Sequence, residues 1–99
     1  MSNLITPQNN KSANSIRQKI VEANPEAIMI QGYDDCIVGV SINDQVIYDV
    51  DSIIKKLMGI DHDMNHESAV EWFEFNILGR FSNQVNEPIF VSFNYTYDF

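Results

Sequence analysis

The segment Val38–Tyr48 reads VGVSINDQVIY and holds the clearest fold signal in the chain, with β-branched runs on both sides of Asn43 and Asp44. Asparagine and aspartate tolerate the positive φ angle that a tight turn demands. The segment therefore predicts a β-hairpin. If its loop has two residues, Gly39 faces Tyr48, and the tyrosine ring covers the bare backbone of the glycine.

Upstream of the hairpin, the sequence predicts an arm, a helix and a strand. Residues 1–13 are rich in Asn, Ser and Gln, and such a segment buries too little apolar area to offset the entropy cost of ordering. We expect a flexible N-terminal arm there and a single domain at 14–99. Helical spacing of apolar residues predicts a helix over Ser15–Ala23. Runs of branched residues predict strands at Ala27–Ile30 and Cys36–Ile42.

Downstream of the hairpin, the apolar periodicity predicts two helices. Asp49 or Asp51 can cap the first, and the second spans His66–Leu78 between Asn65 as its N-cap and Gly79 as its stop. At roughly 100° per residue, the second helix has an apolar face and an opposite acidic edge. The apolar face consists of Ala69, Val70, Phe73 and Ile77.

Residues 89–99 alternate between apolar and polar side chains, which predicts a strand with one buried face. The expected buried positions are Ile89, Val91, Phe93, Tyr95, Tyr97 and Phe99. All elements together predict an α+β domain, with a small, largely antiparallel sheet of three or four strands packed on two or three helices.

Charge is unevenly distributed along the chain. Residues 1–19 carry three bases and no acid, whereas residues 20–99 carry three bases against fourteen acids, a net charge of −11 within a total of −8. Nucleic-acid binding depends on Lys and Arg displacing counterions from phosphates. The acidic body therefore argues against direct nucleic-acid binding and favours a basic partner.

The cysteine content and the hydrophobicity of the sequence indicate in which cellular compartment the protein is located. Cys36 is the only cysteine, so a disulfide framework and a multi-cysteine zinc site are excluded. The N-terminal sequence does not have the pattern of a signal peptide, and no apolar run approaches the roughly 20 residues that span a bilayer. We expect a cytoplasmic protein without a membrane partner.

A partial calcium motif precedes the second helix. Asp61, Asp63 and Asn65 have the spacing of the first three ligands of an EF-hand loop. The sixth position, which requires glycine, is His66, and the twelfth, which requires glutamate, is Trp72. We therefore interpret the segment as a capped loop.

Catalytic signals are weak. His62 and His66, together with nearby acids, could form a metal site or a small enzyme's active site, which is one alternative function. The sequence has no nucleophile elbow and no glycine-rich phosphate loop. Cys36 has no basic neighbour in its strand run, so a core position is expected. We expect no enzymatic activity and no cofactor.

The strongest candidate binding surface combines acids with aromatic residues. Three glutamates lie along the polar edge of the second helix beside two aromatic residues, a composition typical of a binding anchor with a polar surround. A buried Asn76 bonding the loop after Gly32 would bring the acids of that loop onto the same surface. The predicted binding residues are Asp34, Asp35, Glu67, Glu71, Trp72, Glu74 and Phe75, with Asn76 in a structural role.

The segments GYDDCIVG (32–39), YD (48–49) and EFNILG (74–79) form an ordered set. The set resembles a family of small uncharacterised proteins encoded by bacteriophages and other mobile elements, over about residues 27–90. The resemblance implies a mobile-element origin and no established activity. The sequence departs from the family pattern at 80–87, in the N-terminal arm and in the aromatic C-terminal segment.

The leading functional hypothesis is a phage-type interaction module that binds and inhibits a host protein, such as a nucleic-acid-handling or defence factor with a basic surface. An acidic surface speeds association with such a partner. The alternative is a self-assembling accessory protein whose strand at 89–99 pairs with that of a second copy, giving a homodimer.

Overall fold

The computed structural model describes residues 8–59 and 63–93 of the 99, with side chains from Ile16 onward. These residues form an α+β domain, as predicted. The chain order is α1 (Gln8–Ala23), the 3₁₀ turn η1 (Asp34–Cys36), β1 (Ile37–Val40), β2 (Val46–Asp49), α2 (Val50–Leu57), α3 (His66–Phe73), the π-helical turn η2 (Glu74–Leu78), α4 (Gly79–Phe81) and β3 (Ile89–Val91).

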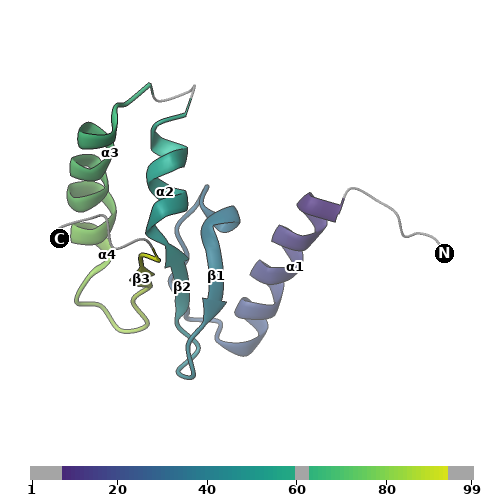
Figure 1. The fold of residues 1–99 in the computed structure, drawn as a ribbon. Helices are drawn as coiled ribbons and strands as arrows, with labels where there is room; N and C mark the ends of the chain where they lie inside the picture. The colour runs from purple at the N-terminus through teal and green to yellow at the C-terminus, as the bar shows by residue number, and fades with distance from the viewer. Residues whose placement is uncertain (1–7, 60–62, 94–99) are drawn as a thin grey trace.

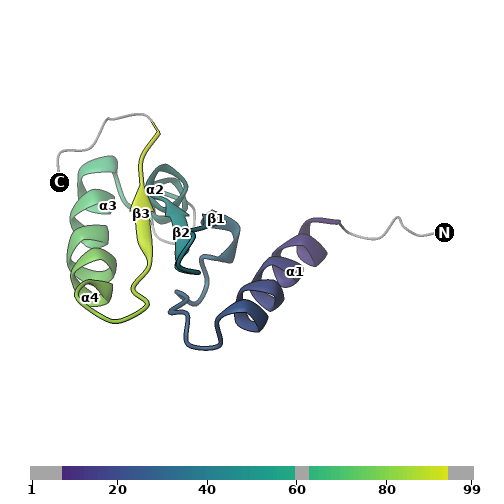
Figure 2. The same cartoon turned by 90° about the horizontal axis from the view of Figure 1, so that it is seen from below.

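The sheet has the strand order β1-β2-β3. β1 and β2 form the predicted antiparallel hairpin, and β3 pairs with β2 in parallel. A parallel pair needs a long crossover connection, which here consists of α2, α3, η2 and α4. Two views at right angles show the same order across the molecule, with α3 and α4 at one side, then β3, β2 and β1, and α1 beyond β1 (Figures 1 and 2).

The hairpin loop is one residue longer than expected. The Ser41 N–H donates to the Gln45 carbonyl at 2.8 Å, which leaves residues 42–44 as the loop. Asp44 has a φ angle of 62°. A three-residue loop that ends with a left-handed residue is the next most common hairpin connection after the two-residue forms.

The longer loop shifts the strand register. Gly39 lies opposite Ile47, and the expected pairing of Gly39 with Tyr48 is wrong. An irregularity between Ile37 and Gly39 then places Ile37 opposite Tyr48. A bulge of this kind takes up one extra residue in one strand and increases the local twist.

Two expected elements near the N-terminus differ from the structure. α1 begins at Gln8, so residues 8–13 are helical rather than part of an arm, and residues 1–7 lie outside the described residues. The expected strand at Ala27–Ile30 is a coil without regular secondary structure. Its backbone is held by other groups, because the Ile28 N–H donates to the Asn86 carbonyl at 3.4 Å and the Ile30 N–H donates to a tyrosine side chain described below.

The second predicted helix is longer and less regular than expected. Asn65 caps it as predicted, with Oδ1 accepting from the Ser68 N–H at 2.8 Å. Its helical course continues through η2 and α4 to Phe81. Gly79 does not stop it, since its φ of −66° is right-handed. Asp49 caps α2 by accepting from the Asp51 N–H at 3.2 Å.

The hydrophobic core lies where α2 and α3 meet the sheet. Its largest fully buried side chains are Tyr48, Phe73, Ile53, Ile54, Leu57, Val46 and Val50. Phe90 of β3 joins them, with ring centroids 6.0 Å from Tyr48 and 5.4 Å from Phe73. The expected inward alternation of this strand is wrong in its described part, because Phe90 faces the core and Phe93 is 65% exposed. Residues 94–99 lie outside the described residues.

Tyr48 supports the coil at Ala27–Ile30 through a hydrogen bond. Its side chain is 0% exposed, and its hydroxyl oxygen accepts the buried Ile30 N–H at 2.8 Å. A buried donor that loses its only acceptor costs about 1–3 kcal/mol.

Replacement of Tyr48 by phenylalanine should therefore lower the free energy of unfolding by about 1–3 kcal/mol, because the ring is kept while the Ile30 N–H loses its acceptor. Urea denaturation followed by circular dichroism measures this change. Tyr33→Phe is the matched control, because Tyr33 is half-buried and its ring contact with Lys56 is retained. An equal loss in both variants would contradict the role given to the Tyr48 hydroxyl.

Candidate functional site

The two aspartates of η1 are occupied by ion pairs. Arg17 of α1 donates to both carboxylate oxygens of Asp34, at 2.6 Å and 3.0 Å. Lys56 of α2 donates to both oxygens of Asp35, at 3.1 Å and 3.0 Å. These hydrogen bonds raise the pKa of Arg17 and of Lys56. η1 therefore joins α1 to α2, and its charge is largely neutralised within the chain.

Among the residues that the structure describes, the acids along the outer edge of α3 and η2 have no such partners. Glu67 and Glu71 are exposed and Glu74 is half-exposed. Within the described part of the chain, none of these three carboxylates forms a salt bridge. They stay available to charges from another molecule.

The two aromatic residues of the predicted site have different environments. Trp72 is half-buried and packs against the core. Phe75 is 80% exposed, although it lies only three residues further along the helix. Phe75 follows Glu71 by four residues, a spacing at which helical side chains are neighbours, and Glu74 precedes it in the sequence. We call Glu67, Glu71, Glu74 and Phe75 the α3 edge.

The expected role of Asn76 is wrong. Its side chain is exposed, and its amide nitrogen donates to the Trp72 carbonyl of the same helix at 3.1 Å. It therefore does not bridge to the loop after Gly32. The acids of η1 and those of the α3 edge form no single surface, since α2 contacts both η1 and α3 and lies between them (Figure 1).

The π-helical turn explains why Asn76 is outside the core. A π turn closes with i→i+5 hydrogen bonds, and the Gly79 N–H here donates to the Glu74 carbonyl. Each residue of a wider turn advances by less than the 100° of an α-helix. Asn76 consequently stops short of the apolar face, and Ile77 reaches it, at 2% exposure.

Cys36 has the properties of a core residue. It is 3% exposed, and burial, together with the nearby Asp35 carboxylate, raises the pKa of its thiol to about 12. The thiolate is the nucleophilic form of cysteine. Cys36 is therefore an unreactive thiol at neutral pH.

The described residues of the loop before α3 do not form a metal site. Asp61 and His62 lie outside the described residues. Asn65 uses its side-chain oxygen as a helix cap. Within residues 8–59 and 63–93, no group of three or more His, Cys, Asp or Glu side chains is arranged to hold a metal ion.

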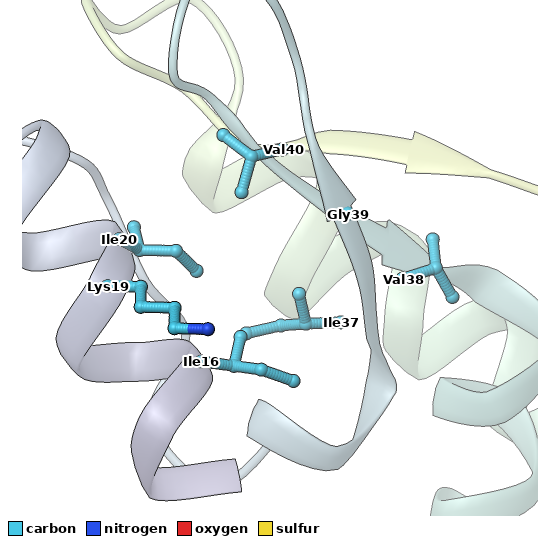
Figure 3. A pocket seen from close by; sticks show the side chains of 7 residues that line it. All are labelled: Ile16, Lys19, Ile20, Ile37, Val38, Gly39 and Val40. Atoms are coloured by element: carbon cyan, nitrogen blue, oxygen red, sulfur yellow. The ribbon is translucent and has the colours of Figure 1, made fainter. Parts of the chain in front are cut away.

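A groove that the sequence pattern did not predict lies between α1 and β1. Its volume is about 260 Å³. Figure 3 shows side chains of α1 and β1 facing each other across it. The lining residues are Ile16, Lys19 and Ile20 from α1, and Ile37, Val38, Gly39 and Val40 from β1. The apolar residues of both elements were visible in the sequence, but their meeting depends on the position of β1 at the sheet edge.

Comparisons with protein-family models, with curated proteins and with solved structures found no match for this chain. The resemblance to phage and mobile-element proteins therefore stays a prediction. None of the described helices is both long enough and apolar enough to cross a membrane.

The raised pKa of Cys36 predicts a specific pH dependence of stability. Between the ordinary thiol pKa of 9.0 and about 12, the folded state holds a proton that the unfolded state has lost. The free energy of unfolding should therefore fall as pH rises above 9, by up to about 1.4 kcal/mol per pH unit. Urea denaturation of Cys36→Ala should show a shallower fall between pH 9 and 10. An unchanged slope would contradict the buried, protonated thiol.

Proposed function

We propose that this chain is a small acidic protein-interaction module whose α3 edge binds a partner protein with a basic surface. The observation that carries the proposal is the 80% exposure of Phe75 on the same helical segment as three carboxylates that form no salt bridge within the described residues. Exposed aromatic residues are enriched at the centre of protein interfaces, where they act as anchors within a polar rim.

The contrast with η1 supports the choice of the α3 edge over the other predicted acids. Asp34 and Asp35 already hold Arg17 and Lys56, and a partner would have to displace these internal bases. The α3 glutamates need only give up water. A basic partner therefore gains more from the α3 edge than from η1.

The net charge of −8 supports a role for electrostatic attraction in association. Long-range attraction raises the association rate of oppositely charged surfaces, and salt screens it. The sequence resemblance to phage-encoded proteins extends the proposal to a host protein in the cytoplasm, one that handles nucleic acid or takes part in defence. Occupation of its basic surface by the module inhibits it.

Reversal of charge on the α3 edge tests the electrostatic part of the proposal. The variant Glu71→Lys with Glu74→Lys should capture less of a basic partner from host lysate at low salt, and the remaining capture should vary less with salt. Quantitative mass spectrometry of captured proteins at two salt concentrations measures both effects. Glu22→Lys with Glu26→Lys is the matched control, because these two exposed glutamates give the same change in net charge. Equal capture by both double variants would refute the α3 edge as the binding surface.

Truncation of Phe75 tests the anchor separately from charge. Phe75→Ser should leave the free energy of unfolding nearly unchanged, because the ring is largely exposed. Binding of the captured partner should weaken by about 2 kcal/mol, roughly thirtyfold in Kd, as measured by calorimetry. Val85→Ser removes another apolar side chain, 84% exposed, and serves as the control. A Kd that responds equally to both substitutions would argue against Phe75 as an anchor.

A further inference from the structure

The groove between α1 and β1 follows a free sheet edge. β1 pairs only with β2 among the strands of the described chain. α1 lies beyond the opposite side of β1 in both views (Figures 1 and 2). A helix placed alongside an edge strand leaves room for one extended segment, which can add to the sheet by main-chain hydrogen bonds.

The surface around this edge is apolar. Val38 and Val40 of β1 are 50% and 42% exposed, and Ile42 in the following loop is 99% exposed. On the helix side, Ile16 is 37% exposed. Figure 3 shows Ile16 and Ile37 turned toward each other across the groove. An added strand would remove these side chains from water.

At Gly39, β1 presents backbone without a side chain to the groove. A Cβ atom built on Gly39 would meet no heavy atom within 4 Å, and its backbone φ lies outside the left-handed region. The fold itself therefore does not require glycine at this position. Glycine inside a strand is found where another backbone approaches closely.

The positive charge of the groove favours an acidic occupant. Among the described residues that line the groove, Lys19 is the only charged one and none is an acid. Lys19 is exposed and forms no salt bridge within the described chain. On a protein with a net charge of −8, this is a local site for an acidic segment.

Residues 94–99, which lie outside the described residues, match these requirements in their sequence, NYTYDF. Apolar Tyr95, Tyr97 and Phe99 alternate with polar residues, and alternation suits a strand that has one buried face. Asp98 supplies the only charge of the segment. We propose that the groove between α1 and β1 binds residues 94–99 of a second copy of this chain as an added strand, with Asp98 close to Lys19.

The segment of a second copy fits better than that of the same chain. β3 is at the far edge of the sheet from the groove, and the Phe93 N–H that follows it is held by the Asp51 carboxylate at 3.2 Å. Residues 94–99 of the same chain would therefore use part of their length in crossing the sheet, whereas those of a second copy can approach β1 from its open side. Reciprocal exchange between two copies forms a closed dimer, and one-directional exchange forms a longer chain of molecules.

Self-association of the full chain tests this proposal. Sedimentation velocity over a wide range of protein concentrations should show dimers or larger species. Gly39→Val adds a branched side chain beside the groove, at a position where a Cβ atom meets no heavy atom within 4 Å. It should raise the dissociation constant at least about tenfold, while circular dichroism and urea denaturation show an intact fold. Tyr95→Ser with Tyr97→Ser should have the same effect. A full-length chain that stays monomeric, or an association that Gly39→Val leaves unchanged, overturns the proposal.

A charge exchange tests the pairing of Lys19 with Asp98. Lys19→Glu and Asp98→Lys should each weaken association, and the chain that carries both should recover it, because the attraction is restored with reversed signs. Lys55→Glu is the matched control, since Lys55 is exposed on α2. Failure of the double variant to recover association overturns the assigned pairing.

The α3 edge takes no part in this groove, so the variant Glu71→Lys with Glu74→Lys should self-associate like the original chain. A variant that loses partner capture and still self-associates bears on the α3 edge alone. A variant that loses self-association and still captures the partner bears on the groove alone. A fluorescent peptide with the sequence of residues 91–99 should bind the full chain and be excluded by Gly39→Val. Equal binding to both proteins counts against the groove.

Discussion

The fold depends on Tyr48, which is fully buried and joins three separate parts of the chain. It is part of β2, its ring stacks with Phe90 of β3, and its hydroxyl holds the Ile30 N–H of the coil before η1. A buried phenol that found no partner would be unfavourable, and a buried N–H equally so. Their hydrogen bond removes both costs and fixes the coil, and with it η1, against the sheet.

Much of the fold follows from local sequence signals. The hairpin and the Asp49 and Asn65 caps are confirmed because each depends on a few neighbouring residues. The loop length was wrong because Asn43 and Asp44 suit both two-residue and three-residue loops. The choice between them was made by Ser41, whose hydroxyl accepts from the backbone N–H groups of Asn43 and Gln45.

The candidate site was predictable as a list of residues but not as an arrangement. The acids and aromatic residues of the α3 edge could be recognised from helical spacing. The pairing of Asp34 with Arg17 could not, because it joins residues 17 positions apart through the placement of α1. The exposure of Asn76 depends on the π-helical turn, which a fixed 100° per residue does not describe. As a result, the acids expected on one surface lie on two. Those of η1 form ion pairs with Arg17 and Lys56, and those of the α3 edge form no salt bridge within the described residues.

Asp51 has a consequence for the order in which this fold assembles. Its carboxylate, on a residue 8% exposed, accepts the Phe93 N–H at 3.2 Å from a residue 42 positions away. Contacts between distant positions require a large loop to close first, so they form later than local ones. The hairpin and α2 are contiguous in the chain and can form early, whereas β3 docks only after the intervening crossover has been made. During synthesis, β2 therefore leaves the ribosome with an open edge that its own chain covers last.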